Sequence, residues 1–284
     1  MTDSSIFIAG ANGQLGLALQ AQYPGAKTAD IDMLDITDRV SVEAFDWSSI
    51  KIILNAAAFT NVDGAESSEG RIAAWQVNAM AVSNLARMSI KHDITFVHVS
   101  TDYVFDGSQD SHTEEEPLSP LSVYGQSKAA GDIIVSLIPK HYLVRTSWVI
   151  GEGKNFVRTM LSLGQQGTTP TVVADQVGRL TFTSELVRAI DHLLSSNCPF
   201  GIYNVSNGGE PASWADITRE IFADADINLA VSNTTTAEYY KGKQGVAPRP
   251  LSSTLALDKI LSTGFSPRDW REDLKKYVAK EVNS

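Results

Sequence analysis

The chain has 284 residues, of which 43% are hydrophobic and 20% charged, and its formal net charge is −10 at pH 7. This length is sufficient for one large α/β domain, or for one domain with an added lobe. The acidic balance argues against nucleic acid as a partner, because binding phosphate backbones requires clusters of Lys and Arg that this sequence lacks. The single cysteine, Cys198, excludes an intrachain disulfide and argues against a cysteine-based zinc site.

The amino-terminal residues, Met-Thr-Asp-Ser-Ser, have neither the basic segment nor the apolar segment of a signal peptide. No segment approaches the roughly 20 apolar residues that a membrane-spanning helix needs. We therefore expect a cytoplasmic protein with no membrane partner.

Apolar segments alternate with helical patterns along most of the chain. Strands are predicted at residues 5–9, 50–55, 95–100, 141–145 and 201–205, and helices at 13–22, 69–92, 121–137, 183–195 and 270–282. Strands that are apolar almost throughout and alternate with helices indicate a parallel sheet covered on both faces. The predicted fold is therefore α/β, a Rossmann-like doubly wound parallel sheet.

The sequence becomes looser after Trp148, with turn-rich segments at 151–170 and 232–250. We interpret these segments as parts of a smaller lobe inserted after the sheet. The predicted division is a dinucleotide-binding core at 1–150, to which 171–206 returns, and a smaller C-terminal α/β substrate lobe formed by 151–170 and 207–284.

A glycine-rich turn follows the first predicted strand and opens the first helix. Its three glycines are Gly10, Gly13 and Gly16. Such a turn allows the backbone to approach a pyrophosphate, and the helix N-terminus presents free N–H groups to it. The spacing Gly-x-x-Gly-x-x-Gly is the variant found in short-chain dehydrogenases. The predicted cofactor set also includes Asn12, Gln14, Leu15 and Thr60, which lie in or near these motifs.

Asp30 lies 20 residues after Gly10, where an acidic side chain can accept hydrogen bonds from an adenosine ribose. Asp32 competes for this role, and both favour NADH, whereas Arg39 is a remote candidate for a 2′-phosphate. NADH and NADPH both stay open. Asp35 and Ile36 are candidates to flank the adenine.

Two further segments belong to the predicted cofactor site. Ala56, Ala57 and Ala58 end the third strand with side chains small enough for a cofactor to lie against the backbone, or for tight helix packing. Asn78 lies inside the following helix, where it is a poor helix former, and we expect it to support the site structurally.

Tyr124 and Lys128 are four residues apart in a predicted helix, so their side chains share one face. An adjacent cation favours the ionised form of a phenol, which makes Tyr124 a candidate proton donor and acceptor near neutrality. Thr101 ends a strand upstream, at the edge where α/β sheets bind ligands. Its hydroxyl is a candidate to bond a carbonyl oxygen, in preference to that of Ser100.

The order of these motifs resembles the extended short-chain dehydrogenase/reductase family. The resemblance implies that Tyr124 is the general acid, that Lys128 lowers the pKa of Tyr124 and bonds the nicotinamide ribose, and that Thr101 orients the carbonyl. Segments such as Ser100-Thr-Asp-Tyr-Val-Phe, Arg145-Thr-Ser-Trp and Arg249-Pro-Leu-Ser-Ser narrow the resemblance to the dTDP-4-dehydrorhamnose reductases.

This narrower resemblance implies reduction of the 4-keto group of a dTDP-linked 6-deoxy sugar to give dTDP-L-rhamnose. It also implies a dTDP-sugar site. The substrate-binding candidates are Val62, Asp63, Thr101, Asp102, Tyr103, Trp148 and Arg249, with Asn155, Gln176 and Thr181 as weaker candidates for which a structural role is favoured. Trp148 is a candidate to stack on the sugar or the base, and Arg249 to bind the pyrophosphate.

The sequence departs from this family at several positions. Leu180-Thr181 stands where a Pro-Thr pair is usual, which affects the shape of that loop. Some members dimerise through magnesium bound by glutamates, for which Glu185 and Glu281 are candidates, but Ala18 occupies the place of a third. We therefore predict no metal site, and a homodimer stays open.

Three alternatives remain at this point. The chain could be another nucleotide-sugar 4-ketoreductase or an epimerase on the same scaffold. A third alternative is a non-catalytic NADP-binding regulatory subunit of a methionine adenosyltransferase. The joint presence of Thr101, Tyr124 and Lys128 favours an enzyme.

Overall fold

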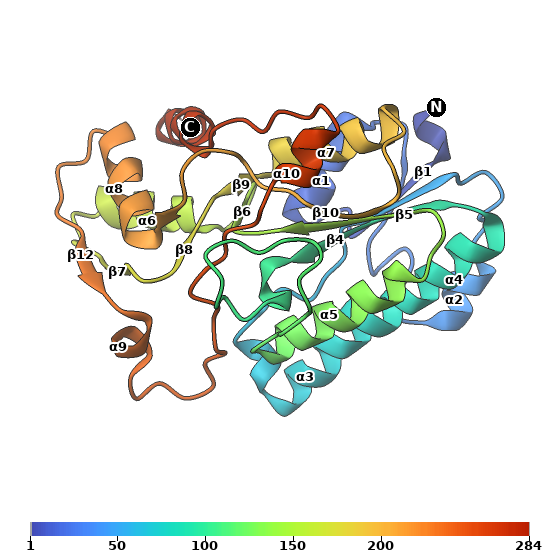
Figure 1. The fold of residues 1–284 in the computed structure, drawn as a ribbon, viewed down its shortest axis with the longest axis horizontal. Helices are drawn as coiled ribbons and strands as arrows, with labels where there is room; N and C mark the ends of the chain where they lie inside the picture. The colour runs from blue at the N-terminus through green and yellow to red at the C-terminus, as the bar shows by residue number, and fades with distance from the viewer. Residues whose placement is uncertain (1, 284) are drawn as a thin grey trace.

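The computed structural model describes residues 2–283, and a six-stranded parallel sheet forms the larger of its two parts (Figure 1). The strands are β1 (Ile6–Ala9), β2 (Lys27–Ala29), β3 (Ile52–Asn55), β4 (Thr95–Thr101), β5 (His141–Thr146) and β10 (Gly201–Asn204). Their order is β10-β5-β4-β3-β1-β2, and every neighbouring pair is parallel. The predicted doubly wound α/β sheet is confirmed.

Helices cover both faces of this sheet (Figure 1). One face carries α1 (Gln14–Gln22), α7 (Thr183–Ser195) and the short α10 (Asp258–Ser262), and the other carries α2 (Arg39–Ala44), α3 (Ser68–Trp75), α4 (Val82–His92) and α5 (Val123–Ser136). Each face buries its own apolar cluster, as expected when strands are apolar on both sides.

The predicted helix over 69–92 is interrupted. A π-helical segment, η3 (Gln76–Ala81), joins α3 to α4. Single π-helical turns within helices are often associated with functional sites. This segment places Asn78 beneath the loop that follows β3. Three short 3₁₀ helices also occur in the described part of the chain: η1 (Asp3–Ser5), η2 (Gly64–Glu66) and η4 (Asp102–Val104).

The smaller lobe lies at the carboxyl end of the sheet (Figure 1). Its helices are α6 (Phe156–Gln165), α8 (Trp214–Asp224), α9 (Thr236–Tyr240) and α11 (Trp270–Val282). Three short strand pairs complete it: β6 (Val149–Ile150) with β9 (Thr181–Phe182), β7 (Thr171–Val173) with β12 (Ser232–Thr234), and β8 (Val177–Gly178) with β11 (Ala212–Ser213). A separate apolar cluster packs the helices α6, α8 and α11 against β6, β7, β9 and β11.

The packing differs from the expected division in two places. The strands β7, β8 and β9 fall within 171–206, but Val172, Leu180 and Phe182 pack in the lobe, and only α7 and β10 join the main sheet. Conversely, Ile260 and Phe265 pack against the core of the main sheet. Within residues 2–283, no helix combines the length and apolarity that crossing a membrane requires.

Candidate active site

The glycine-rich turn lies where the strand order reverses, between β1 and β3. From β1 the chain moves outward to β2 and then returns to place β3 on the other side. Gly10 has a φ of +74°, and a Cβ atom there would lie 2.6 Å from the Cα of Ala57. A Cβ on Gly16 would lie 2.1 Å from the carbonyl oxygen of Gly10. Both glycines are therefore required by the packing, and the turn fits the close approach of a dinucleotide.

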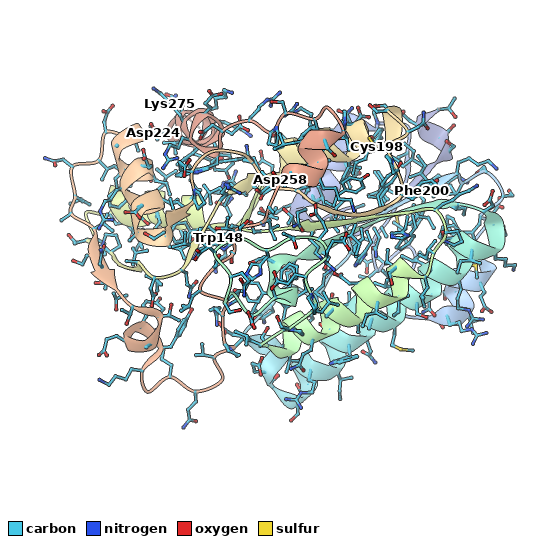
Figure 2. The ribbon with its side chains drawn as sticks, in the orientation of Figure 1. Trp148, Cys198, Phe200, Asp224, Asp258 and Lys275 are labelled. Atoms are coloured by element: carbon cyan, nitrogen blue, oxygen red, sulfur yellow. The ribbon has the colours of Figure 1, made fainter. Side chains whose placement is uncertain are left out.

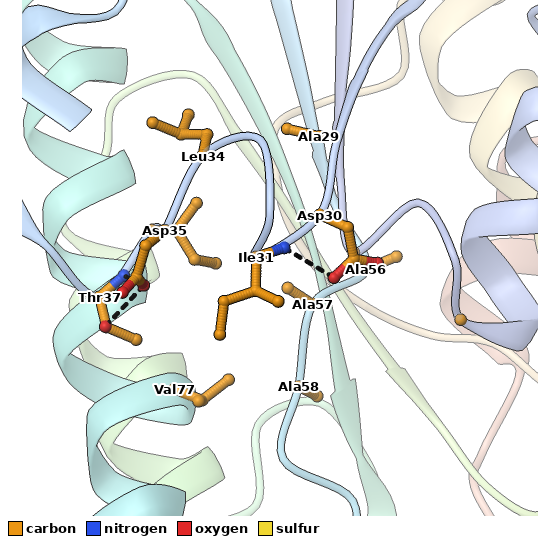
Figure 3. Close-up of a pocket in the computed structure, with 13 residues that line it drawn as sticks. Ala29, Asp30, Ile31, Leu34, Asp35, Thr37, Ala56, Ala57, Ala58 and Val77 are labelled. Carbon is orange, nitrogen blue, oxygen red and sulfur yellow. Dashed lines mark hydrogen bonds between the residues drawn. The ribbon is translucent and has the colours of Figure 1, made fainter. Parts of the chain in front are cut away.

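A pocket of about 300 Å³ opens beside this turn (Figure 3). Its lining residues are Gly10, Gly13, Ala29, Asp30, Ile31, Leu34, Asp35, Ile36, Thr37, Ala56, Ala57, Ala58 and Val77. Asp30 is fixed at the rim, where Oδ2 accepts from the N–H of Asn12 at 3.0 Å and Oδ1 from that of Ile31 at 2.8 Å. Apolar walls with a carboxylate at the rim fit an adenosine.

A second pocket, of about 440 Å³, shares Gly13, Ala56 and Ala58 with the first. It lies over the carboxyl ends of β3, β4 and β5. Its further lining residues are Gln14, Leu15, Thr60, Val62, Val99, Ser100, Thr101, Asp102, Tyr103, Tyr124, Lys128, Thr146, Ser147, Trp148, Val149 and Leu186. The two pockets form one cleft that runs from the predicted adenosine end to the predicted catalytic residues.

Tyr124 lies in the first turn of α5, which Ser122 caps by accepting a hydrogen bond from the N–H of Gly125. The phenol is buried, and burial raises its pKa above the ordinary value, while a hydrogen bond with Thr101 acts in the opposite direction. Tyr124 therefore holds its proton at neutral pH. This is the state that a proton donor requires.

Thr101 is placed by its own turn. Its hydroxyl donates to Oδ1 of Asp102 at 3.1 Å and accepts from the N–H of Tyr103 at 3.2 Å. Burial raises the pKa of Asp102 to about 6. The ring of Tyr103 meets that of Tyr124 edge-on, with centroids 5.5 Å apart.

Lys128 lies on the same face of α5, but its amine contacts β4. Nζ donates to the carbonyl oxygen of Val99 at 2.7 Å and lies 3.3 Å from Nε2 of His98. The side chain is only 1% exposed, and burial lowers its pKa to about 8, while the charge of Asp132 acts in the opposite direction. His98 is held from its other side by Asn55, whose Nδ2 lies 2.9 Å from Nδ1.

A buried ion pair supports this arrangement one turn further along α5. Asp132 accepts from Nε of Arg145 at 3.0 Å, and both side chains are almost fully buried. Burial raises the pKa of Asp132, and the Arg145 guanidinium opposes this shift. The pair anchors α5 to β5.

A third pocket, of about 560 Å³, lies in the smaller lobe and meets the second at Tyr103. Its walls include Phe156, Met160, Val172, Gln176, Trp214, Tyr239, Tyr240 and Arg249. Trp214 stacks on Trp148, with ring centroids 3.7 Å apart. Trp148, which has a φ of +45°, lies where the main sheet meets the lobe (Figure 2).

Arg249 forms a forked ion pair with Asp63 across 186 residues. Nη1 donates to Oδ1 at 2.8 Å and Nη2 to Oδ2 at 2.9 Å. The N–H of Ala247 donates to the same carboxylate at 2.9 Å. This contact ties the segment after α9 to the loop after β3, at the wall of the third pocket.

The sequence of this chain is similar to those of known reductases of dTDP-linked keto sugars. The family model described as the RmlD substrate binding domain matches residues 4–283. This chain belongs to the RmlD family. A dTDP-4-dehydrorhamnose reductase of Aggregatibacter actinomycetemcomitans is 37% identical over 297 residues, which cover 96% of this chain and 98% of that protein. A dTDP-4-keto-6-deoxy-D-glucose reductase of Streptomyces niveus is 38% identical and covers 95% and 94%.

The solved structures include a dTDP-4-dehydrorhamnose reductase of Bacillus anthracis in complex with NADP. It superposes with a TM-score of 0.89 at 34% identity and covers 97% of this chain and 98% of that one. The predicted resemblance to the dTDP-4-dehydrorhamnose reductases and the predicted Rossmann-like α/β fold are therefore confirmed.

Most predicted site residues of this RmlD-family chain line the cleft, while a few have structural contacts instead. Asn78 bonds the backbone of Phe59 through both its oxygen, at 2.9 Å, and its nitrogen, at 3.1 Å, and also reaches Ser127, which supports the loop above it. Asn12 contributes its backbone N–H to Asp30, and Gly16 packs against Gly10.

Three predicted substrate residues have structural contacts in this chain, and a role in substrate binding stays a prediction for them. Asn155 caps α6 by accepting from the N–H of Arg158, and its amide donates to Gly151 and Tyr277, so it lines none of the three pockets. Asp63 is engaged by Arg249 and lines none of them either. Thr181 is buried within β9. By contrast, Gln176 lines the third pocket and accepts from Nε1 of Trp214 at 3.3 Å.

The expected effect of Lys128 on Tyr124 also differs from the structure. The Lys128 amine is directed to His98 and Val99, and the pKa of Tyr124 is raised by burial. An i,i+4 spacing places two side chains on one face but does not fix which atoms meet.

The two glutamates considered as magnesium ligands have protein partners. Glu185 accepts from Arg188 at 2.6 Å, and Glu281 pairs with Arg158 at 2.7 Å. Among residues 2–283, no group of three or more His, Cys, Asp or Glu side chains is placed to hold a metal ion.

Sequence reasoning missed His98 and Asn55, which face each other in register on β4 and β3. The available signal was a polar residue at the end of the apolar β3 and a histidine between Val97 and Val99 in β4, because a buried polar side chain requires a partner. The walls formed by Trp214, Tyr239 and Tyr240 were also missed, since α8 and α9 were not predicted.

Proposed function

We propose that this chain reduces the 4-keto group of dTDP-4-dehydro-6-deoxy-L-mannose (dTDP-4-dehydrorhamnose) to give dTDP-L-rhamnose, using NADH or NADPH. One observation carries the proposal: Thr101, Tyr124 and Lys128 line a single pocket that is continuous with the glycine-rich turn. The relatives named above provide the substrate class.

Each residue has a defined task in this reaction. A bound nicotinamide dinucleotide supplies the hydride. Tyr124 holds a proton and gives it to the C4 oxygen as that oxygen gains charge. Thr101 orients the same oxygen by turning its hydroxyl proton from Asp102, to which it donates in the structure, to the substrate. Lys128, held by Val99 and His98, lines the same pocket and adds its charge there.

The third pocket suits the nucleotide part of the substrate. It is lined by aromatic side chains, with Arg249 at its wall, and it meets the catalytic pocket at Tyr103. We propose that the smaller lobe binds the dTDP moiety, and that Trp148 separates the nucleotide from the sugar. Both terminal nitrogens of Arg249 donate to Asp63, so binding of a diphosphate requires either that this ion pair opens or that the guanidinium contacts both partners at once.

The test is incubation of the purified protein with the 4-keto sugar nucleotide and each reduced cofactor. We expect loss of the absorbance of the reduced cofactor, and dTDP-L-rhamnose as the product identified by NMR. An unchanged absorbance with substrate present would contradict an active reductase and would favour the non-catalytic regulatory reading.

A second candidate has support from the Streptomyces niveus relative, which is named as a reductase of a different dTDP-4-keto sugar. The same experiment with dTDP-4-keto-6-deoxy-D-glucose separates the two, because only the preferred keto sugar should give rapid turnover. A homodimer and a cytoplasmic location stay predictions. Light scattering on the purified protein tests the first, and cell fractionation tests the second.

A further inference from the structure

A buried series of contacts links the wall of the cofactor pocket to Lys128. It runs from the N–H of Ala57 through the side chains of Asn55 and His98 to the lysine amine. Asn55, His98 and Lys128 are each at most 1% exposed. Because water does not reach these side chains, each donor and acceptor must be matched by its neighbour, and the role of one group fixes that of the next.

The first contact sets the orientation of the Asn55 amide. Oδ1 accepts from the N–H of Ala57 at 3.2 Å, which leaves Nδ2 facing Nδ1 of His98 at 2.9 Å. An amide nitrogen only donates, so Nδ1 of His98 is the acceptor and carries no proton. Burial lowers the pKa of His98 well below its ordinary value, and the charge of Lys128 acts in the same direction. His98 is therefore neutral, with its one ring proton on Nε2.

This ring proton faces the Lys128 amine. Nε2 of His98 lies 3.3 Å from Nζ, which also donates to the carbonyl oxygen of Val99 at 2.7 Å. The imidazole packs closely against α5, since a Cβ on Gly131 would lie 3.6 Å from Nε2. A charged ammonium has only donors and cannot use the N–H of His98, whereas a neutral amine accepts it. This tautomer of His98 therefore favours the neutral form of Lys128.

The other titratable side chains near the amine lie on α5. Tyr124 holds its proton, because burial raises its pKa. The charge of Asp132 raises the pKa of Lys128, against the larger effect of burial. Arg145 on β5 donates to Asp132 at 3.0 Å, so this carboxylate is shared between two cations. The contact with His98 thus acts together with burial and against Asp132.

From these contacts we propose that Asn55 and His98 are positioning residues for Lys128, and that the Asn55 amide selects the His98 tautomer whose Nε2–H is directed at the amine. The inference rests on the proposed function, in which Lys128 takes part. Neither Asn55 nor His98 lines the catalytic pocket, so both act on the reaction through Lys128. They hold its amine at β4 and set the pH at which it loses its charge.

The direct test is the tautomer of His98, measured by NMR from the chemical shifts of the ring nitrogens in protein labelled with nitrogen-15 histidine. The chain has five histidines, and His98→Phe identifies the His98 signals by their loss. We expect a proton on Nε2 and none on Nδ1 in the wild type. Asn55→Asp replaces the donor by an acceptor, so the proton should appear on Nδ1. A proton on Nδ1 in the wild type would overturn the inference.

The second measurement is the pH dependence of kcat/KM for keto-sugar reduction. In Asn55→Asp, Nε2 of His98 becomes an acceptor and a carboxylate is added, and both changes favour the charged form of Lys128. The alkaline decline expected near pH 8 should therefore move up by at least about one pH unit. Asn55→Ala removes the donor without adding a charge, and should move the decline in the same direction by less.

Asn84→Asp is the matched control. Asn84 is also buried, but its amide donates to the backbone carbonyls of Ile36 and Thr37. This variant should leave the His98 signals and the alkaline decline in place. A decline that stays at the wild-type pH in Asn55→Asp, or in Asn55→Ala if the first variant does not fold, would overturn the inference. Absence of keto-sugar reduction by the wild type would overturn the proposed function alone, because the tautomer is measured without substrate.

Discussion

The Lys128 amine lies 3.3 Å from Nε2 of His98, and the state of that histidine is set by Asn55. Oδ1 of Asn55 accepts from the N–H of Ala57, so its Nδ2 group donates to Nδ1 of His98. A neutral His98 then carries its proton on Nε2, facing Lys128. Burial and this contact both favour the neutral amine, in agreement with a Lys128 pKa of about 8.

This relationship predicts the alkaline limit of the reaction. Lys128 is charged below its pKa and neutral above it, so kcat/KM for keto-sugar reduction should fall as the pH rises through about 8. Tyr124 does not account for such a limb, because its pKa is raised above the ordinary value. Lys128→Arg stays charged throughout, so its lower residual activity should show no decline near pH 8. If kcat/KM of this variant still declined near pH 8, the decline would come from the titration of another group.

Asp102, which accepts a hydrogen bond from the catalytic candidate Thr101, should also affect the free energy of unfolding. Its folded-state pKa of about 6 exceeds the usual value, so charging it in the folded state costs on the order of 2–3 kcal/mol at neutral pH. This cost is absent below about pH 4 and fully present above about pH 6. Asp102→Asn should therefore raise the free energy of unfolding in urea at pH 7.5, with a smaller gain at pH 4.5.

Asp106→Asn is the matched control for this measurement. Hydrogen bonds from Ser108 lower the pKa of Asp106, so its charge is favourable in the folded state and its removal should give no gain at pH 7.5. Equal gains for Asp102→Asn at both pH values would show that its effect is not one of charge.

The two glycines of the turn should respond differently to alanine. Gly10→Ala places a Cβ 2.6 Å from the Ala57 backbone at a positive φ, so it should destabilise the fold and abolish dinucleotide binding. Gly13 has room for a Cβ, which would lie 3.5 Å from the carbonyl oxygen of Gly10, but it lines both pockets of the cleft. Gly13→Ala should keep the melting temperature within a few degrees while weakening NAD⁺ binding. Comparable losses of melting temperature in both variants would contradict this separation.

Arg249 should affect the sugar nucleotide and not the cofactor, because it lines only the third pocket. Arg249→Gln should raise the KM of the keto-sugar nucleotide by about 10–100-fold, the range for one charge-assisted hydrogen bond. The dissociation constant of NAD⁺ should not change. Arg219→Gln, at an exposed pair with Asp216, is the control and should leave both constants unchanged. An unaltered KM in Arg249→Gln would exclude Arg249 from the substrate site.

The main sheet was predictable because its strands are apolar in sequence and alternate with helices. The cleft was predictable for the same reason, since Gly10, Thr101 and Tyr124 follow strands whose carboxyl ends must meet. The lobe was not predictable, because strands of two or three residues such as β6 and β8 carry too little periodicity. Capping signals at Asn155 and Ser213 could have indicated α6 and α8.

Contacts between segments that are distant in the chain could not be predicted from the sequence either. The register that pairs Asn55 with His98 decides where Lys128 is directed, and the Asp63–Arg249 pair joins residues 186 positions apart. Neither follows from local spacing. Both therefore required the folded chain.

The central claim is that Tyr124 protonates the C4 oxygen of the keto sugar, and its most direct test compares Tyr124→Phe with Tyr103→Phe. Both rings line the catalytic pocket and meet edge-on, so the pair separates the loss of the proton donor from the loss of a neighbouring hydroxyl. We expect Tyr124→Phe to bind NAD⁺ like wild type and to lose about 10²–10⁴-fold in kcat, and Tyr103→Phe to lose much less. Turnover by Tyr124→Phe at the wild-type rate would show that the proton comes from another group.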